Sequence, residues 1–310
     1  MDTAGAGAQA AHVHPVPSST PPPSPSPSAT SQASLAHWSE AGRRGMEAFY
    51  ALATEDYRQL AAARDWAGTF RSLAAGRDRI GLLDVACGSG KFPTALLATP
   101  DVAALAGELV VQTDLLDPSR FSLDEARGTL APPFEGAADH ECTLQDLAVR
   151  PGGWDLVWST HGLYALAPDE VAAGMARFVD AIAPGGLGVV AQATTASHYL
   201  VVDDAFRRSF DPDGARVPYT SAEQVLAALD DLPVVVERQP LTYRTSVARD
   251  DRATAEGFLQ RCVFDDSVPL GAMEADPVLG AYLDSCVDGD RWVFDHRVEL
   301  ITVRHAEVAA

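Results

Sequence analysis

The sequence predicts an α/β fold built on a doubly wound, mostly parallel sheet of seven strands, with helices before the sheet and a lid after it. From Arg79 onward, short apolar runs alternate with segments of helical periodicity. A glycine-rich turn follows the first of these runs, and Pro184-Gly185-Gly186 interrupts the chain before a later one. Strands that are buried on both faces give continuous apolar runs, so this pattern favours a parallel sheet.

The length of 310 residues favours one domain, residues 36–310, preceded by a tail. Residues 1–35 consist mainly of Ala, Ser, Pro and Gly and include the run Pro21 to Ser28. Such a composition cannot bury enough apolar area to offset the entropy of ordering. We therefore expect residues 1–35 to be disordered.

Two helices are expected within residues 36–78, ahead of the first strand. Apolar residues occur at helical spacing over Glu40 to Ala53 and again over Glu55 to Leu73. Ser39 is a suitable N-cap for the first helix, and Gly76 is a suitable stop after the second.

Residues 79–195 are expected to form the core of the sheet. The runs predicted to be buried strands are Ile80 to Val85, Leu109 to Leu115, Trp154 to Ser159 and Leu187 to Ala193. Helices are expected over Phe92 to Leu97, directly after the glycine-rich turn, and over the amphipathic segment Asp169 to Ile182.

Residues 196–305 are expected to add the last strands and two insertions. The spacing of Thr220 and Glu223 predicts a capping box that starts a helix to Leu229. Further strands are predicted over Val234 to Tyr243 and Val298 to Arg304, whereas about His198 to Val217 and Asp250 to Asp290 interrupt the alternation. Insertions usually lie above the carboxyl ends of the strands, so we expect these two to form a substrate lid.

The chain is strongly acidic. It contains 43 Asp and Glu against 23 Lys and Arg, for a formal charge of -20. The average field of such a chain repels polyanions, so nucleic acid and anionic membranes are not expected as partners. A small cationic amine would be attracted by the same field, although an acidic surface also serves solubility alone.

The four cysteines, Cys87, Cys142, Cys262 and Cys286, form no CxxC pair and have no histidine at metal-ligand spacing. We expect reduced, mostly buried thiols and no bound metal. The N-terminus lacks the basic and apolar segments of a signal peptide, and no apolar run approaches the ~20 residues that span a bilayer. A cytoplasmic location is therefore expected.

The strongest local signal is Leu82-Leu83-Asp84-Val85-Ala86-Cys87-Gly88-Ser89-Gly90, at the junction of a predicted strand and a predicted helix. Gly88 and Gly90 allow a backbone with positive φ and a close approach of a ligand, whose carboxylate can meet the helix amides that follow. Asp84 can accept from an ammonium group, and we predict that Ala86 also contacts the ligand. Alone, such a turn is equally typical of a nicotinamide site or of a tight turn without a ligand.

Acidic residues follow the next two strands. Leu109 to Leu115 runs into Asp114-Leu115-Leu116-Asp117-Pro118, and a carboxylate at this point binds ribose hydroxyls in nucleotide-binding folds. The proline after Asp117 favours Asp117, with Asp114 as the alternative. Asp146, in the loop after the presumed third strand, can accept from an adenine amine. These acids could equally be helix N-caps or solvated loop residues.

Together these elements resemble the motifs of class I S-adenosylmethionine-dependent methyltransferases, over about Ile80 to Ala193. The glycine pattern lacks the GxGxxG form of dehydrogenases, because Lys91, Phe92 and Pro93 follow Gly90, and there is no GK[ST] of a P-loop. The resemblance implies S-adenosylmethionine as the cofactor, bound by the residues above and by Thr160.

A looser resemblance covers most of the chain after the tail. Trp158 to Tyr164, Tyr219-Thr220-Ser221, Cys262-Val263-Phe264 and Arg291 to His296 occur in the order seen in the histamine N-methyltransferase family. In that family a carboxylate and two amides face the substrate, and the resemblance puts Glu55, His161 and His296 at those positions as catalytic residues. Because histidines replace both amides, an acceptor other than histamine is expected.

The same resemblance implies an aromatic wall around the substrate. Its members would be Trp38, Tyr50, Tyr164, Tyr199, Phe206, Tyr219 and Phe264. Aromatic residues belong to the core more often than to a ligand cage, so we expect only about half of them to touch the substrate.

The sequence thus predicts methyl transfer from S-adenosylmethionine to a small aromatic or heteroaromatic amine. His161 would accept the proton of the reacting nitrogen, and Glu55 would hold a cationic amine. Methylation of an electron-rich ring carbon, as in an indole, is the alternative within the same class. From other classes, the alternatives are a non-catalytic nucleoside-binding regulatory module and an NAD-linked oxidoreductase.

Overall fold

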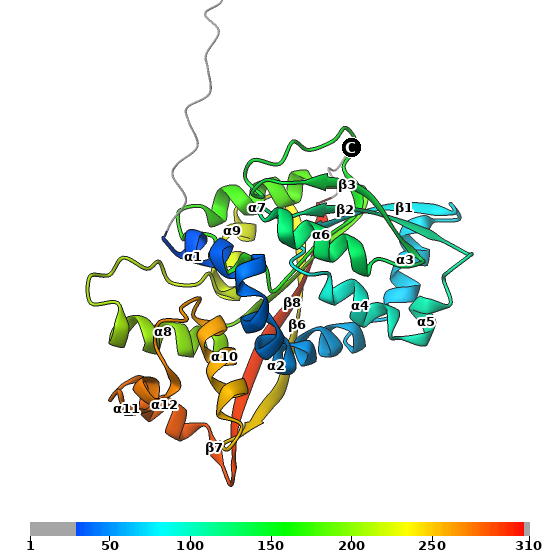
Figure 1. The fold of residues 1–310 in the computed structure, drawn as a ribbon. Coiled ribbons are helices and arrows are strands. Elements are labelled where there is room, and N and C mark those ends of the chain that lie inside the picture. The colour runs from blue at the N-terminus through cyan, green and yellow to red at the C-terminus, as the bar shows by residue number, and fades with distance from the viewer. Residues whose placement is uncertain (1–28, 307–310) are drawn as a thin grey trace, which may run out of the picture.

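The computed structural model describes residues 29–306 of the chain (Figure 1). A central sheet contains β1 (Arg79–Val85), β2 (Val110–Leu116), β3 (Phe134–His140), β4 (Trp154–Thr160), β5 (Ile182–Ala193), β6 (Val234–Ala248), β7 (Val287–Asp288) and β8 (Arg291–His305). The strand order is β3-β2-β1-β4-β5-β8-β6, and the two-residue β7 pairs with β8. Pairs among β1 to β5 are parallel, whereas β8 is antiparallel to β5 and β6. The predicted α/β fold with a mostly parallel sheet is confirmed.

Helices cover both faces of the sheet. One face packs against α2 (Arg43–Ala62), α3 (Trp66–Ala74), α4 (Lys91–Leu97) and α5 (Pro100–Ala103). The other packs against α7 (Val171–Asp180) and α9 (Ala222–Asp230), and α6 (Arg120–Thr129) lies against β2. Trp158 and Trp154, both fully buried, belong to the cores of the first and the second face. Each large apolar side chain buried in this way contributes about 1.5 to 3 kcal/mol.

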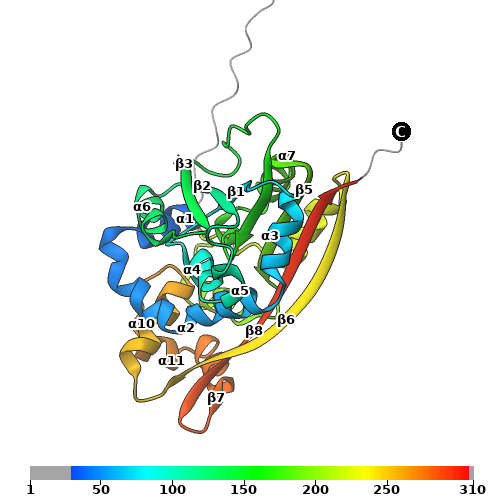
Figure 2. The same ribbon diagram turned by 90° about the vertical axis from the view of Figure 1, so that its right-hand side faces the viewer.

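A separate group of helices, the cap, lies at one end of the sheet. It consists of α8 (His198–Phe210), α10 (Arg252–Cys262), α11 (Leu270–Ala275) and α12 (Leu279–Ser285). The cap helices share a core with Trp292 and Phe294 of β8. Figure 2 shows β6 and β8 as a long curved ribbon that extends beyond the other strands toward this end. The two predicted insertions therefore pack together as one unit.

The strands β6 and β8 are longer than predicted. The sequence predicts a strand end at Tyr243 and a strand start at Val298, but pairing continues to Ala248 and from Arg291. In the extension of β8, buried Trp292, Phe294 and His296 alternate with less buried neighbours, because only one face is covered. This alternation differs from the continuous apolar runs on which the strand prediction rests.

The N-terminal boundary needs a correction. Residues 29–35, predicted as part of a disordered tail, belong to α1 (Ala29–His37). The hydroxyl of Thr30 donates to the carbonyl of Val217 at 2.9 Å and accepts from the amide of the same residue at 3.0 Å. This contact joins segments that are far apart in the sequence, so composition alone does not reveal it. The rest of the predicted tail, residues 1–28, lies outside the described residues.

The predicted break between the N-terminal helices is also misplaced. The sequence predicts it near Thr54, but α2 runs through this point, and the Thr54 hydroxyl donates to the carbonyl of Tyr50 within the helix at 2.6 Å. The break lies just before α3, where Asp65 caps the helix by accepting from the amide of Gly68 at 2.8 Å. The short helix η1 (Glu40–Gly42) precedes α2.

The capping box of α9 lies one residue later than predicted. Ser221 and Gln224 form it, with both reciprocal hydrogen bonds present. The hydroxyl of Thr220 instead donates to the carbonyl of Leu166 at 2.8 Å, and the Glu223 carboxylate accepts from the amide of Thr195. The predicted helix itself is present and ends at Asp230.

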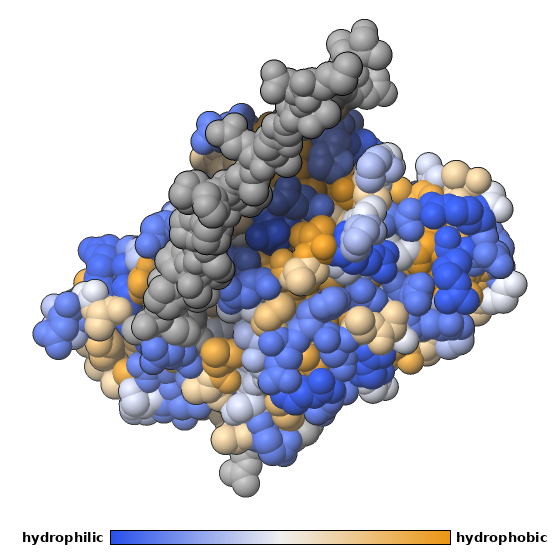
Figure 3. All heavy atoms as spheres, turned by 90° about the horizontal axis from the view of Figure 1, so that it is seen from above, coloured by the Kyte–Doolittle hydropathy of each residue, from blue (hydrophilic) through white to orange (hydrophobic). Residues whose placement is uncertain are grey.

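Few large apolar side chains reach the surface. Among the described residues the exposed one is Val235, at 54%. Figure 3 shows a mostly hydrophilic face seen from above, with apolar residues in small separate groups. No helix within residues 29–306 combines the length and the apolar character needed to cross a membrane.

Candidate active site

A cavity of about 810 Å³ lies where the carboxyl ends of β1, β2 and β4 meet α1, α2 and the cap. Parallel sheets of this type bind ligands at this edge, because the loops that follow the strands converge there. Most of the predicted site residues line the cavity: Asp84, Ala86, Gly88, Asp117, Asp146, Thr160, His161, Trp38, Tyr50, Tyr164, Tyr199, Tyr219 and Phe264. Glu55, His296, Gly90 and Phe206 do not.

The glycine-rich turn follows β1 as predicted, but its two glycines differ in position. Gly88 has φ +50° and lines the cavity, and a Cβ there would lie 3.9 Å from the hydroxyl of Tyr50. Gly90 has φ +67°, and a Cβ there would lie 2.3 Å from the Thr129 hydroxyl and 3.0 Å from Cα of Ala126. Gly90 is therefore required for the packing of the turn against α6, and it does not line the cavity.

Three residues of the cavity wall have an unusual backbone. Ala86, His161 and Phe264 have φ values of 54°, 54° and 48°, in the left-handed region that costs energy for residues other than glycine. The amide of His161 donates to the carbonyl of Ala191 at 2.8 Å, which helps to hold this conformation. Such residues often occur at functional sites, so their position here supports this cavity as the active site.

Asp117 lies at the end of β2 with its carboxylate at the cavity. It accepts from the amide of Gly88 at 3.1 Å and from the amide of Ser119 at 2.9 Å. Burial raises the pKa of Asp117 to about 6, although these two amides favour its charged form. Asp117 therefore joins the turn after β1 to the end of β2, and its remaining lone pairs can bind a ligand.

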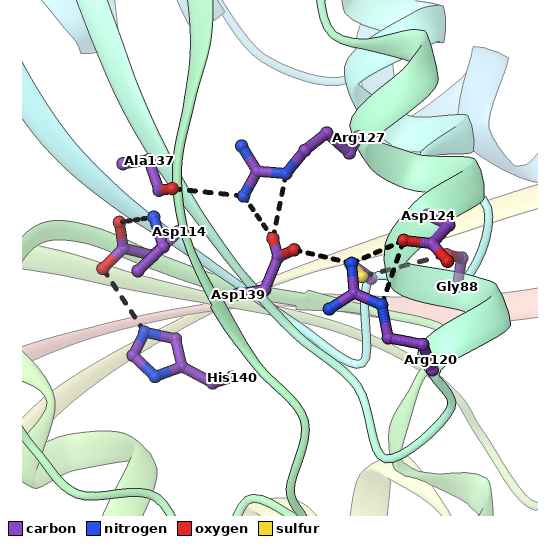
Figure 4. Close-up of polar contacts among 10 residues, drawn as sticks. Gly88, Asp114, Arg120, Asp124, Arg127, Ala137, Asp139 and His140 are labelled. Atoms are coloured by element: carbon purple, nitrogen blue, oxygen red, sulfur yellow. Dashed lines mark hydrogen bonds and ion pairs between the residues drawn. The ribbon is translucent and has the colours of Figure 1, made fainter.

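Asp114, the alternative to Asp117, has a structural role. It accepts from the indole of Trp154 at 2.9 Å and from the amide of Ala138 at 3.2 Å, and it lies 3.4 Å from the His140 ring. Figure 4 shows Asp114 pointing toward His140, beside Asp139 and its arginine partners. Asp114 does not line the cavity, so the geometry favours Asp117 as the acid that faces a ligand.

Two buried hydrogen-bond acceptors lie in the same half of the cavity. Within the described residues, Oδ2 of Asp84 and Oε1 of Gln145 have no hydrogen-bond partner. Burial raises the pKa of Asp84 to about 7, the nearby indole of Trp158 acts against this rise, and the charge of Asp117 adds to it. Gln145 was missed as a site residue, since the sequence favoured its neighbour Asp146. Asp146 lines the cavity too, and it accepts from the hydroxyl of Thr143 at 2.7 Å.

His161 follows β4 and lies in the other half of the cavity. Its Nδ1 is 2.7 Å from the hydroxyl of Tyr164, in the short helix η2 (Leu163–Ala165), whereas its buried Nε2 has no partner in the described part of the chain. Burial lowers the pKa of His161 to about 4. The ring is therefore neutral at physiological pH, as a proton acceptor must be.

The carboxylate of this half is Asp56, which the sequence reasoning missed in favour of Glu55. Asp56 is 2% exposed and accepts from the hydroxyl of Tyr199 at 2.6 Å, while its Oδ1 has no partner among the described residues. Burial raises the pKa of Asp56 to about 7, although the nearby hydroxyls of Tyr199 and Tyr243 favour its charged form. Glu55 instead binds Arg58 and Gln59 outside the cavity.

His296 and Phe206 are buried away from the cavity. His296 is fully buried in β8, where its Nε2 lies 2.9 Å from the Thr245 hydroxyl and its ring stacks on Tyr243 at 5.0 Å. Burial lowers the pKa of His296 to about 3. Phe206 is also fully buried and packs on Phe210 of the same helix, at 5.1 Å. Both residues support the cap and neither lines the cavity.

The other aromatic residues of the predicted wall line the cavity together. Tyr164 lies 5.7 Å from Tyr219 and 6.0 Å from Tyr199, and Phe264 lies 5.5 Å from Tyr219. Phe49 and Tyr57 of α2 belong to the same wall and were not predicted. Rings at these separations touch one another, so they form a continuous aromatic surface along one side of the cavity, against which a flat ligand can pack.

Metal ligation has no support in the described residues, where no group of three or more His, Cys, Asp and Glu could hold an ion. All four cysteines are free thiols, and Cys262 lines the cavity.

Known structures share this architecture, although the chain matches no protein-family model and no curated protein. It is similar to a candidate methyltransferase from Bacillus halodurans, with a TM-score of 0.52 and 13% identity, over 79% of this chain and 100% of that one. It is also similar to magnesium protoporphyrin IX methyltransferase from Synechocystis with bound S-adenosylhomocysteine (TM-score 0.51, 13% identity, 89% of this chain and 99% of that one). The chain has a methyltransferase fold.

At this identity the likeness establishes the fold alone, and the activity has to be argued from the cavity. The looser resemblance to the histamine N-methyltransferase family stays a prediction.

Proposed function

We propose that the chain is an S-adenosylmethionine-dependent methyltransferase that methylates a small aromatic or heteroaromatic amine and releases S-adenosylhomocysteine. The observation that carries the proposal is a single cavity with two unlike halves. One half follows β1 and β2 and holds the glycine turn, Asp84 and Asp117, and the other holds the aromatic wall, His161 and Asp56. Such a cavity suits a reaction between two ligands that must be held side by side.

The first half fits the cofactor group by group. Asp84 offers a buried, unpartnered carboxylate oxygen to the ammonium of the methionine part. Asp117 offers lone pairs to the ribose hydroxyls, and the loop with Gln145 and Asp146 offers acceptors for the adenine amine. When bound, the cofactor supplies an electrophilic methyl group, so the protein has to orient and desolvate the acceptor.

The second half fits an aromatic amine. Phe49, Tyr164 and Tyr219 offer ring contacts, and Oδ1 of Asp56, whose carboxyl the Tyr243 hydroxyl also approaches, can accept from an amine N–H. His161 offers a neutral imidazole whose Nε2 has no other partner in the described structure. A carbon–nitrogen bond forms as the carbon–sulfur bond breaks, and the proton displaced from the nitrogen goes to His161.

Calorimetric titration with S-adenosylmethionine, S-adenosylhomocysteine and NADH tests the cofactor. We expect dissociation constants in the micromolar range for the first two ligands and no binding of NADH. Methyl-labelled cofactor with a panel of aromatic amines and indoles then tests the acceptor, and product analysis separates N-methylation from C-methylation. Binding of the cofactor without turnover on any acceptor would favour a regulatory nucleoside-binding module. The surface of the described residues argues against such a module, because it has no exposed apolar patch of the kind expected where a partner protein binds.

Asp56→Asn is expected to remove the pH dependence of acceptor binding. Because the pKa of Asp56 is about 7, its carboxyl is neutral below that pH and anionic above it. The affinity for a cationic amine should therefore rise as the pH rises through 7 in the wild type, and it should be lower and flat in the variant. Titrations of the acceptor between about pH 6 and pH 8 measure this.

Glu55→Gln is the matched control, because Glu55 is the adjacent acid on α2 and lies outside the cavity. It should behave as the wild type does. A loss of acceptor binding in Glu55→Gln with normal binding in Asp56→Asn would return the role to Glu55.

A further inference from the structure

The helix α1 and the turn after it lie across the cavity. Ser34, Leu35 and Trp38 line the cavity from this side. The Trp38 carbonyl accepts from the Ser119 hydroxyl at 2.7 Å, and the Ser119 amide donates to Asp117 at 2.9 Å. The segment therefore contacts the proposed cofactor half directly.

The same segment also reaches the acceptor half. The ring of His37 lies 5.8 Å from that of Phe264, and its Nε2 lies 3.1 Å from a carboxylate oxygen of Asp266. A ligand that enters or leaves either half passes a wall of which α1 is a part.

One buried cation fixes this segment. Arg261, in the last turn of α10, is 1% exposed and lines the cavity. Its guanidinium donates to the carbonyl of His37 and, at 2.5 Å, to the carbonyl of Gly42, and it lies 5.1 Å from the centre of the Trp38 ring. These carbonyls belong to the ends of α1 and η1, where carbonyls lack partners within their own helices. A single side chain thus caps two helix ends and packs on the residue between them.

The start of α2 is shaped to admit this guanidinium. A Cβ at Gly45 would lie 2.9 Å from Nη2 of Arg261, which is too close for ordinary contact. In the described residues Arg261 forms no ion pair with a carboxylate, and burial lowers its pKa, although the nearby charge of Asp266 acts in the opposite direction. The two carbonyls, the Trp38 ring and the more distant charge of Asp266 therefore stabilise the charge of Arg261, and the carbonyls and the ring do so only while the segment is docked.

We propose that Arg261 is a positioning residue, which holds Trp38 and the α1–α2 turn over the cofactor half and so slows the escape of bound cofactor. This inference depends on the proposed cofactor but not on the proposed acceptor. It can therefore be tested with S-adenosylhomocysteine alone.

Arg261→Met keeps the length and apolar character of the side chain but removes its charge and its donors. We expect the dissociation rate of S-adenosylhomocysteine and its dissociation constant to rise at least about tenfold, as for the loss of one charge-assisted hydrogen-bonded contact. For Arg261→Lys, both values should lie between those of the wild type and Arg261→Met, because an ammonium can reach one carbonyl but lacks the planar fork that reaches both. Stopped-flow displacement and calorimetry provide the two quantities.

Arg252→Met is the matched control for this variant. Arg252 lies at the start of the same helix, is half exposed, and pairs with Glu274 away from the cavity. Arg252→Met should leave the dissociation rate and the dissociation constant of S-adenosylhomocysteine within about twofold of the wild type, as expected for a surface ion pair. Thermal unfolding of each variant provides the check that α10 still folds.

A second variant tests the contact while Arg261 is still present. Gly45→Ala places a methyl group against the guanidinium and, by itself, favours the helix, since alanine is the better helix former by about 1 kcal/mol. We expect weaker S-adenosylhomocysteine binding, about threefold or more, without loss of thermal stability. A merely structural role for Arg261 does not predict this combination.

Trp38→Ala tests the route of the effect. If Arg261 acts through Trp38, the double variant Trp38→Ala/Arg261→Met should release S-adenosylhomocysteine less than about threefold faster than Trp38→Ala alone. A dissociation rate tenfold higher in the double variant than in Trp38→Ala, or an unchanged rate in Arg261→Met alone, would overturn the inference. Failure of the wild-type protein to bind S-adenosylhomocysteine would overturn the cofactor proposal and this inference together, whereas binding that Arg261→Met leaves unchanged overturns only this one.

Discussion

Asp117→Ala is expected to weaken S-adenosylmethionine binding at least tenfold. Hydrogen bonds to a charged group contribute about 1.5 to 3 kcal/mol, and each 1.4 kcal/mol corresponds to about tenfold in affinity. The variant removes the proposed acceptor for the ribose hydroxyls, and it also releases the Gly88 amide from its present partner. Both losses act on the cofactor half of the cavity. Calorimetry with S-adenosylmethionine measures the change.

Asp114→Asn is the control for this experiment, since Asp114 lies in β2, just before Asp117 in the sequence, but outside the cavity. It should lower the free energy of unfolding, because its carboxylate accepts from Trp154 and Ala138 in the core. Its affinity for the cofactor should stay within about twofold of the wild type. Weaker cofactor binding in Asp114→Asn, with normal binding in Asp117→Ala, would contradict the proposed ribose contact.

The site residues that could be predicted from sequence lie at the carboxyl ends of the strands and in the turns that follow them. Asp84 and Gly88 are fixed by the junction of a buried apolar strand with a glycine turn, and both signals are local. The choice of Asp117 over Asp114 rested on where the strand ends. The proline at position 118 marked that end, and β2 does end at Leu116.

The acids of the N-terminal helices could not be assigned in the same way. Neighbouring residues on a helix point about 100° apart, so an error in the helix bounds exchanges an inward residue for an outward one. The predicted break near Thr54 cut α2 in two. The continuous helix places Asp56 on the same buried face as Ala53 and Leu60, with Glu55 beside it and outside the cavity.

Arg261 and His296 depended on tertiary contacts. A basic residue near the end of an amphipathic helix is usually solvated, and only the return of the α1–α2 turn over α10 buries Arg261. His296 was predicted from its place in a family pattern. In the extended ribbon of β6 and β8, the alternation of β8 directs its ring against Tyr243 inside the core, where it supports the wall from behind.

His161→Asn is expected to lower kcat by 10²- to 10⁴-fold, the usual contribution of a general base, with the affinity for S-adenosylhomocysteine unchanged. Asparagine is preferred to alanine because position 161 has φ 54°, which asparagine tolerates better than most residues. Because the backbone strain stays comparable, the loss of kcat can be attributed to the missing imidazole. Steady-state kinetics at saturating cofactor, with an acceptor found in the panel of aromatic amines and indoles, measures this change in kcat.

The pH dependence separates His161 from Asp56. Because the pKa of His161 is about 4, its imidazole is already neutral at pH 5 and above, so kcat should be flat from about pH 5 upward with respect to this group. The ionisation near pH 7 should appear instead in kcat/KM, from Asp56. Tyr164→Phe, which removes the hydroxyl 2.7 Å from Nδ1, should lower kcat by a smaller factor than His161→Asn. A wild-type kcat in His161→Asn would exclude the histidine as the proton acceptor and leave Asp56 as the group to test next.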